Sequence, residues 1–257
     1  MAGNTSTPGA TVTSRVMALL GAFDDAHRRL SLTELARRAE VPVPTAHRLV
    51  AELVAHGALS RAEDGRYEVG RRMWDLGLLA PVQLDLVELA SPFLHDLYGA
   101  TFATVHLAVR DGRECLYLDR LRGHASVPVV STVGARLPLH ATGVGKVLLA
   151  HAPADVREAV LTGGLRRVTS RTVVDPGTLA RQLEAVVREG WAVTAEEMSL
   201  GTASAAVPVR RGEDVVAALG LVVPPRQLQR PRLVAALQVA AQGIGRALVS
   251  RERAGGR

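Results

Sequence analysis

Cysteine and long apolar runs are scarce in this chain of 257 residues. Its single cysteine, Cys115, cannot form an internal disulfide, which is typical of a protein from a reducing compartment. We find no continuous apolar run of the roughly 18 residues needed to cross a bilayer, and the polar first residues lack the apolar core of a signal peptide. The sequence therefore predicts a cytoplasmic protein without a membrane partner.

Lysine is nearly absent as well, because Lys146 is the only lysine among the 31 basic residues. The net charge of +6 permits nucleic-acid binding but does not demonstrate it. Residues 1–69 hold eight arginines and eight acidic residues, whose charges cancel. Any affinity of this region for DNA must therefore depend on where individual arginines lie.

The sequence also lacks the common nucleotide-binding motifs. Residues 143–146 read Gly-Val-Gly-Lys, but a Walker A loop would need glycine at His140 and a hydroxyl residue at Val147. A dinucleotide-binding fingerprint would need a third glycine at Leu148. These residues can still form a helix N-terminus whose free N–H groups hold an anion, or a structural turn.

Other reactive side chains are isolated in the sequence. Cys115 lies in a β-rich run without a base, which favours a buried, inert thiol. The eight histidines are scattered, and no His-Glu-x-x-His, cysteine pair or Gly-x-Ser-x-Gly occurs. Glu196 and Glu197 could form an acid–base pair, but adjacent residues on a strand point to opposite faces. We therefore expect no catalytic residue, no metal site and no cofactor.

Three helices are predicted in the first 57 residues. The first covers residues 12–23 and is expected to bury one apolar stripe. Ser31 and Glu34 fit a capping box that begins a short second helix. That helix stops before Pro42, which can open the third helix, and Gly57 can end it. The stripe of the first helix consists of Val12, Val16, Leu19, Leu20 and Phe23.

A hairpin is predicted after the third helix. Asp64 and Gly65 form a strong turn signal, and short β-rich runs on either side make a wing with Arg61 and Arg66 near its tip. Opposite its apolar face, the third helix carries small residues and Arg48, so it can lie close to a DNA groove. This order of elements is that of a winged helix-turn-helix. The pattern alone leaves a small protein-interaction domain open as the alternative.

The remainder of the chain predicts an α+β domain. An apolar stretch over residues 82–98 is expected to form a linker helix, which either contributes to a dimer contact or packs on its own C-terminal domain. After Thr101, hairpin signals alternate with helices, and Thr142 can cap one of these. An amphipathic helix over residues 231–249 closes the domain. Strands joined by hairpins rather than by regular βαβ units indicate an antiparallel sheet.

Several segments resemble the IclR family of bacterial transcription regulators. SLTELA at residues 31–36 and VPVPTAHRL at 41–49 are similar to the family's helix-turn-helix. RLPLHATGVGKVLLA at 136–150 is similar to its sensing domain, as is GWAVTAEE at 190–197 running on to AVPV at 206–209. The resemblance therefore covers nearly the whole chain.

This resemblance implies both an organisation and a function. The function is that of a sequence-specific DNA-binding regulator, in this family more commonly a repressor, whose operator affinity a small-molecule effector modulates. One winged helix makes too few contacts for tight specific binding, so we expect a dimer, or a tetramer formed from dimers, on a palindromic or repeated operator. The implied parts are a flexible N-terminus (1–11), a winged helix-turn-helix (12–70), a linker helix (71–99), a GAF-like effector-binding α+β domain (100–250) and a flexible tail (251–257).

The residues expected to contact double-stranded DNA lie on the second helix, the third helix and the wing. Thr45, His47 and Arg48 are expected to face the major groove, although His47 could instead be a partly buried residue at the flank of the helix. The family more often has serine where Pro44 stands, so one hydroxyl contact is missing here. The full expected set is Ser31, Thr33, Pro44, Thr45, His47, Arg48, Arg61 and Arg66.

The resemblance also places an effector pocket between the sheet and the helix that starts near Thr142. Family members that bind small keto acids have an acid where Thr194 stands and hydroxyls where Gly220 and Val222 stand. A small acid would leave hydrogen bonds unmade here, at about 1–3 kcal/mol each. We therefore expect a larger, more apolar carboxylic acid, aromatic or aliphatic, with its carboxylate at the N–H groups near Gly143. The expected pocket residues are Gly143, Val144, Thr194, Ser204, Gly220 and Val222.

Two other classes of function remain open on the residues alone. A ligand-binding protein-interaction adaptor would have a pocket but would not retard promoter DNA in a gel. A small-molecule enzyme would convert its ligand, whereas a sensor would only bind it. The missing catalytic motifs make the enzyme the weakest of these classes.

Overall fold

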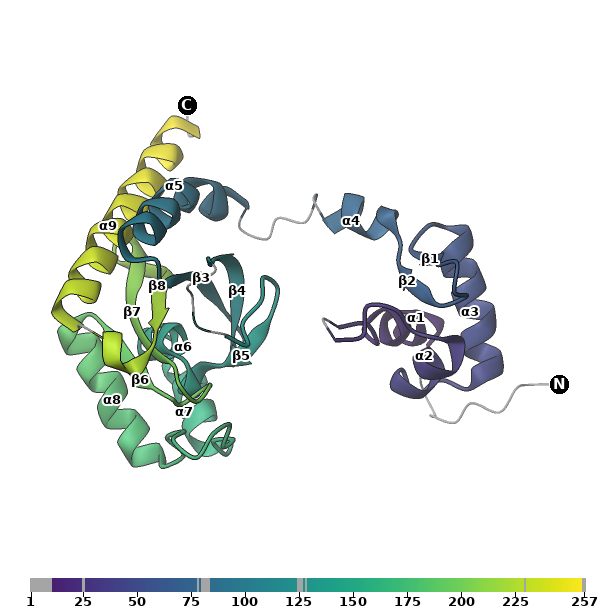
Figure 1. The fold of residues 1–257 in the computed structure, drawn as a ribbon, viewed down its shortest axis with the longest axis horizontal. Helices are drawn as coiled ribbons and strands as arrows, with labels where there is room; N and C mark the ends of the chain where they lie inside the picture. The colour runs from purple at the N-terminus through teal and green to yellow at the C-terminus, as the bar shows by residue number, and fades with distance from the viewer. Residues whose placement is uncertain are drawn as a thin grey trace. The chain divides into compact units, whose positions relative to one another are not determined.

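The computed structural model describes residues 11–24, 26–77, 79, 84–123, 127, 129–228 and 230–255. The chain divides into two compact units, Met1–Val82 and Gln83–Arg257 (Figure 1). The expected flexible N-terminus lies outside the described residues apart from Thr11. The Thr11 hydroxyl accepts a hydrogen bond from the Ser14 N–H at 3.1 Å and caps the first helix.

The first unit consists of three helices, a two-stranded hairpin and a fourth helix. Its core brings together buried leucines from the first three helices, among them Leu19, Leu35 and Leu49. The elements are α1 Val12–Leu20, α2 Leu32–Arg38, α3 Val43–Ala55, β1 Leu59–Arg61, β2 Tyr67–Val69 and α4 Arg71–Gly77. This order confirms the predicted winged helix-turn-helix.

The capping box at the start of α2 is confirmed. The Ser31 hydroxyl accepts a hydrogen bond from the Glu34 N–H at 3.3 Å, and the Glu34 carboxylate accepts one from the Ser31 N–H at 2.8 Å. Together these bonds pair two backbone groups that the first helical turn cannot pair internally. α3 begins after Pro42, and Gly57 follows its end with a φ of +71°, a conformation that glycine adopts without strain.

The predicted stripe of the first helix is only partly correct. Leu19 is fully buried, but Val12 is 57% exposed, so the prediction is wrong at that residue. Val12 is the first residue of α1, and this helix enters the core through its C-terminal half. Phe23 lies beyond the end of α1 and still packs against the core.

The wing is a short antiparallel hairpin whose turn contains Gly65 with a φ of +80°. Leu30, just before α2, exchanges two backbone hydrogen bonds with Tyr67 of β2, at 3.0 and 2.8 Å. The start of α2 is therefore tied to the wing by the backbone, which fixes both elements in the same unit.

Two helices stand where one linker helix over residues 71–99 was expected. α4 ends at Gly77, and α5 covers Leu84–Thr101 within the second unit. The buried side chains of α5, which include Leu86, Leu94 and Leu97, belong to the core of the second unit.

The second unit is built on a six-stranded antiparallel sheet with the order β5-β4-β3-β8-β7-β6 (Figure 1). Neighbouring residues of three strands form a row in this sheet, since Thr194 pairs with Ser204 and Ser204 with Val222. The strands are β3 Thr104–Asp111, β4 Glu114–Leu121, β5 Arg136–Pro138, β6 Ala192–Ala195, β7 Ala203–Arg211 and β8 Asp214–Val223. The expected α+β domain with an antiparallel sheet is confirmed.

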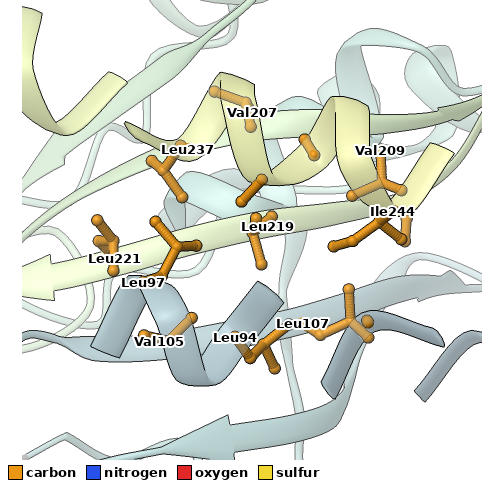
Figure 2. Close-up of a cluster of buried hydrophobic side chains, with 14 of the residues drawn as sticks. Leu94, Leu97, Val105, Leu107, Val207, Val209, Leu219, Leu221, Leu237 and Ile244 are labelled. Atoms are coloured by element: carbon orange, nitrogen blue, oxygen red, sulfur yellow. The ribbon is translucent and has the colours of Figure 1, made fainter. Parts of the chain in front are cut away.

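Helices cover both faces of this sheet. α5 and α9 (Arg230–Gly255) lie on one face, where their leucines meet apolar side chains of β3, β7 and β8 (Figure 2). α6 (Gly143–Ala150) and α8 (Pro176–Glu189) pack on the other, with α7 (Ala154–Thr162) beside them. Single turns η1 (Leu139–Ala141) and η2 (Pro225–Gln227) precede α6 and α9.

Alternation along β8 decides which side chains face α6. Leu219 and Leu221 point to α5 and α9, so Ala218, Gly220 and Val222 point to α6. The residues on the α6 side are smaller, which lets this helix approach the sheet closely.

α9 is longer than the sequence predicts, since residues 251–255 are helical where a flexible tail was expected. Arg251 lies 2.7 Å from the Asp85 carboxylate and Glu252 lies 3.0 Å from Arg211, so ion pairs tie this last turn to α5 and β7. Residues 256 and 257 lie outside the described part of the chain.

By length and composition alone, residues 231–254 of α9 could also cross a membrane. This helix contains no continuous apolar run, since Gln238, Gln242 and Arg246 interrupt it, but its aliphatic residues raise its mean hydropathy. α9 nevertheless buries Leu237 and Ile244 against the sheet, as the core helix of a globular domain does (Figure 2).

Candidate functional site

α3 presents its polar side chains to solvent. His47 and Arg48 are exposed, and neither makes a hydrogen bond or ion pair within the described part of the chain. On the opposite face, Ala46, Leu49 and Val50 are buried and anchor the helix to the core. Rigid burial on one face and unpaired donors on the other is the arrangement that a base-reading helix needs.

The wing arginines are exposed but partly engaged. Arg61 donates a hydrogen bond to the Gly65 carbonyl oxygen at 3.2 Å, and its guanidinium lies 5.7 Å from the centre of the Tyr67 ring. Arg66 lies 4.0 Å from the Glu34 carboxylate. These contacts are too exposed to hold much energy, so both cations remain accessible to an anionic partner.

The other residues expected to contact DNA differ in their exposure and in the hydrogen bonds that they can still make. Thr33 is exposed and Thr45 is half-buried. The Ser31 hydroxyl oxygen already accepts the capping bond from the Glu34 N–H, while its hydroxyl hydrogen remains available to donate. Pro44 lies in the first turn of α3, where its missing N–H costs no helical hydrogen bond.

A cavity lies between the start of α6 and the sheet of the second unit. Its volume, measured to the centre of a water-sized sphere, is about 50 Å³. All six expected effector residues line it: Gly143, Val144, Thr194, Ser204, Gly220 and Val222. Residues from four separate elements, α6, β6, β7 and β8, therefore converge on one space.

The N-terminus of α6 is capped and points at this cavity. The Thr142 hydroxyl accepts a hydrogen bond from the Gly145 N–H at 3.0 Å. The first amides of a helix have no partner within that helix, and its dipole favours an anion there. Gly143 and Val144 carry such amides and line the cavity, so this end of α6 can receive a carboxylate.

Close packing around the cavity explains two of its glycines. A Cβ at Gly143 would lie 2.6 Å from the Ser204 hydroxyl oxygen, which itself lies 2.6 Å from the Thr194 hydroxyl. A Cβ at Gly220 would lie 2.8 Å from a Val144 methyl carbon. The branched side chain of Val144 therefore occupies the space that any side chain at position 220 would need.

Sequence reasoning missed a polar group at another edge of the cavity, His106 of β3. Its Nε2 lies 2.8 Å from the Ser131 hydroxyl, and its ring meets that of Tyr117 edge-on, with centroids 5.0 Å apart. All three residues line the cavity. Burial, aided by the charge of Arg120, lowers the pKa of His106 to about 3, so the ring is neutral at pH 7.

Sequence reasoning also missed the buried ion pair of Lys146 and Glu197. The Lys146 ammonium lies 2.6 Å from the Glu197 carboxylate and 2.8 Å from the Gln182 side-chain oxygen. The two charged side chains are only 1% and 7% exposed. Burial lowers the pKa of Lys146, while the Glu197 carboxylate opposes that shift. The pair joins α6 to the segment after β6 that forms one wall of the cavity.

Glu196 and Glu197 do not form an acid–base pair, but the reason differs from the one expected. β6 ends at Ala195, and Glu196 adopts a φ of +58°, so the two residues do not lie on a strand. Glu197 turns inward to Lys146, while the Glu196 carboxylate accepts a hydrogen bond from the Gly201 N–H at 2.8 Å. Each carboxylate thus has its own structural partner.

Cys115 is buried in the core between the sheet and α6 and α8. Its thiol donates to the Leu137 carbonyl oxygen at 3.2 Å, and burial raises its pKa to about 11. A thiol held protonated in this way is a poor nucleophile. Among the residues described here, no group of three or more His, Cys, Asp or Glu side chains is placed to hold a metal ion.

Some of the missed residues had a signal in the sequence. Period-two alternation places His106 on the other face of β3 from Val105 and Leu107. Once the strand is recognised, the sequence therefore tells which sheet face carries the histidine. Lys146 is a lone cation in an apolar helix, which indicates a buried, paired charge. Its partner, 51 residues away, carries no local signal.

Comparison with known proteins agrees with this arrangement. A family model of the IclR helix-turn-helix domain matches residues 12–63, and one of the C-terminal domain of IclR bacterial transcriptional regulators matches residues 80–246. The chain is 32% identical to the HTH-type transcriptional regulator KipR of Bacillus subtilis, over 79% of this chain and 81% of that protein. It is 31% identical to XynR of Escherichia coli, over 80% and 83%.

Solved structures show the same likeness. An IclR homologue from Microbacterium hydrocarbonoxydans, complexed with 4-hydroxybenzoate, superposes with a TM-score of 0.89 at 36% identity, covering 93% of this chain and all of that one. The IclR protein of Thermotoga maritima gives 0.75 at 27% identity, covering 92% and 98%.

The fold and the matched domains define a DNA-binding transcription regulator with a C-terminal ligand-binding domain. The chain belongs to the IclR family. The resemblance found in the sequence is thereby confirmed.

Proposed function

We propose that the protein represses transcription by binding a palindromic or repeated operator through α3 and the wing. The observation that carries this proposal is that His47 and Arg48 are exposed on α3 and have no partner among the described residues, in a unit that matches the family's DNA-binding domain. One relative, AllR of Escherichia coli, 29% identical over 88% of this chain, is a transcriptional repressor. Thr45 accompanies this pair in the major groove, and Arg61 and Arg66 contact phosphates.

Band-shift titration tests this proposal. Fragments that tile the promoter regions around the gene should include one bound at least 1000-fold more tightly than random DNA at the same salt concentration. A reporter driven by that promoter should become more active when the gene is deleted. Uniform affinity for all fragments would overturn the DNA-binding proposal, and lower reporter activity would replace repression by activation.

We further propose that the protein acts as a dimer, or as a tetramer formed from dimers. Large apolar side chains are exposed on and near α4, where Trp74 is 67% and Leu79 is 79% exposed. Exposed apolar patches of this kind mark interaction surfaces, and an operator with two half-sites needs two winged helices. Sedimentation of the wild type should show a dimer or tetramer, and Trp74→Glu should weaken both assembly and operator binding. A monomer that binds its operator tightly would contradict this proposal.

The proposed effector is a carboxylic acid with an apolar body, bound with its carboxylate at the amides of Gly143 and Val144. The cavity lining supports this choice, and the relative complexed with 4-hydroxybenzoate shows that a protein of this fold accepts such an acid. A benzene-sized cavity measures about 150 Å³, so an aromatic acid requires the walls to move outward. Val130, Met198 and Ser199 form part of the wall on irregular segments, which can shift without breaking the sheet.

Movement of these walls would also let the effector act on DNA binding. An effector that binds one arrangement of the second unit more tightly than another shifts the population toward it, and operator affinity changes by the same coupling. A thermal-shift screen of carboxylic acids tests the class directly. We expect stabilisation by aromatic or longer aliphatic acids. Stabilisation by glyoxylate or pyruvate, with none by the larger acids, would overturn this class of effector.

The relatives named above are regulators rather than enzymes, and we propose the same for this chain, with the cytoplasm as its location. Any acid that stabilises the protein should be recovered chemically unchanged after prolonged incubation with it.

A further inference from the structure

A second, wider groove lies in the second unit, where α9 packs alongside β7 (Figure 1). Its volume, measured to the centre of a water-sized sphere, is about 620 Å³. One wall is β7 from Val207 to the turn at Gly212, and the other is α9 from Gln238 to Arg253. None of the residues that line it also lines the cavity beside α6, so the groove is separate from the proposed effector site.

The strand wall of this groove is an edge of the sheet. β6 pairs with β7 only along Ala203–Ala206, whereas β8 pairs with β7 as far as Arg211. From Val207 onward, β7 therefore has a paired neighbour on one side only among the described residues. Pro208 has no N–H for a ladder bond, and proline is tolerated in a sheet at an edge. Alternate residues of this half of β7 direct backbone groups outward, where an added strand could bind them.

The helix wall presents polar and cationic side chains. Gln238, Gln242 and Arg246 lie four residues apart and so share one face of α9, and Arg253 follows on that face two turns later. Arg246 and Arg253 are exposed and have no hydrogen-bond or ion-pair partner among the described residues. Arg210 adds a third cation from the strand wall. None of the described residues that line the groove is acidic, so its charge suits an anionic partner.

The dimensions of the groove suit an extended peptide. Its strand wall is about 17 Å long and its helix wall about 22 Å, and an extended chain of about five residues covers the shorter length. Single-stranded nucleic acid is another flexible polyanion, but its sites commonly stack bases on aromatic side chains, and none of the described residues lining the groove is aromatic. A peptide can also pair its backbone with the open strand edge, which a nucleic acid cannot do.

We propose that this groove binds an extended, acidic segment of a partner protein, which adds a strand to β7 beside Val207–Arg211 and places its carboxylates at Arg246 and Arg253. Backbone hydrogen bonds to the strand edge supply affinity for any extended chain, and the arginines select an acidic one. The regulator then has a protein partner in addition to its operator and its effector.

Fluorescence anisotropy of a labelled peptide of alternating glutamate and valine, titrated with the full-length protein, tests this inference. The alternation places all the glutamates on one face of a strand. The peptide should bind, and replacing its glutamates by glutamines should weaken binding at least tenfold. N-methyl groups on every second residue block one edge of the peptide and keep its charge, so one of the two possible patterns should weaken binding by a similar factor.

Substitutions of the two unpaired arginines assign the binding to the groove. Arg246→Ala and Arg253→Ala should each weaken binding of the acidic peptide about fivefold and hardly affect the glutamine peptide. Both side chains are exposed, so both variants should fold. Arg232→Ala is the matched control, because it removes an exposed arginine of the same helix that does not line the groove, and it should leave peptide binding unchanged.

Several outcomes would overturn this inference. Absence of peptide binding at millimolar concentration would do so, as would binding that both arginine variants leave unchanged. Equal binding of the unmethylated peptide and both N-methylated peptides would exclude strand addition. If a thymidine oligonucleotide displaces the peptide from the wild type, the groove is a nucleic-acid site. If the double variant Arg246→Ala/Arg253→Ala sediments as a smaller assembly than the wild type, a second copy of this chain occupies the groove.

Discussion

The two helices that carry the candidate sites treat their polar residues in opposite ways. α3 holds Arg48 and His47 in solvent without a partner in the described part of the chain, whereas every residue of α6 is buried, Lys146 included. On α3 a site consists of the groups that folding leaves unpaired. On α6 the one charged side chain, Lys146, is buried and paired, because an unpaired buried charge would destabilise the domain, and the site consists of backbone amides at the start of the helix. Substitutions on α6 should therefore reduce stability, and substitutions on α3 should reduce binding.

The largest expected effect comes from breaking the buried ion pair. Lys146→Met should lower the free energy of unfolding by about 3–5 kcal/mol, because it leaves the Glu197 carboxylate buried without its cation. Urea denaturation measures this loss. As the matched control, Arg188→Met removes an exposed ion pair with Glu189 and should cost less than about 1 kcal/mol. Equal losses of unfolding free energy in the two variants would show that burial of the Lys146–Glu197 pair does not determine its contribution to stability.

Lowering the pH should reduce the free energy of unfolding, because His106 is buried as an uncharged ring. Its pKa is about 3 in the folded chain and near 6.5 when unfolded, so between these values the unfolded chain binds the extra proton and stability falls as the pH falls. This group alone contributes up to about 1.4 kcal/mol for each pH unit in that window. Urea midpoints measured from pH 7 to pH 4 should fall less steeply for His106→Phe than for the wild type. Parallel curves would contradict the burial of an uncharged ring.

The next largest loss of stability is expected where Gly220 packs against Val144 beside the cavity. Gly220→Ser should destabilise by about 1–3 kcal/mol, because its Cβ would lie 2.8 Å from Val144. Adding Val144→Ala should recover much of that loss, and thermal unfolding of both single variants and the double variant measures the coupling. Gly99→Ser is the control, since a Cβ there meets no atom within 4 Å. Additive effects at positions 144 and 220 would refute the close contact.

On the α3 side we expect lost binding with little lost stability. Arg48→Ala should weaken operator binding by about 1–3 kcal/mol and relax base preference at one position of each half-site. Fluorescence titration with operator and single-base variants measures both. Arg226→Ala removes an exposed arginine from the second unit and should change neither. If Arg48→Ala keeps the operator affinity and the base preference of the wild type, Arg48 does not contact the DNA.

The smallest effect is expected at the tip of the wing. Arg66→Ala should weaken all DNA sequences alike and lower the slope of log affinity against log salt by about one, because it removes one phosphate contact. Its exposed contact with Glu34 is 4.0 Å long, so thermal stability should hardly change. A changed base preference would show that Arg66 contacts bases rather than the phosphate backbone.

Much of the first unit could be predicted because its signals are local. The capping box joins Ser31 to Glu34, and Gly57 and Gly65 mark turns whose backbone conformation glycine readily adopts. Two of the errors arose at the ends of elements, at Val12 and at residues 251–255. There, burial or ion pairs with a distant helix decided the outcome rather than local periodicity.

The sequence by itself determined the order of the elements, the winged helix-turn-helix and the family, because periodicity, caps and turn residues act within a few positions of each other. Only the tertiary structure decided that His106 and Ser131 meet at one edge of a cavity, that Lys146 pairs with Glu197, and that Val144 fills the space above Gly220. These contacts join residues from 25 to 76 positions apart. They form because an antiparallel sheet and a helix packed on it bring distant segments within reach, and burial then makes each unpaired polar group too costly to leave alone.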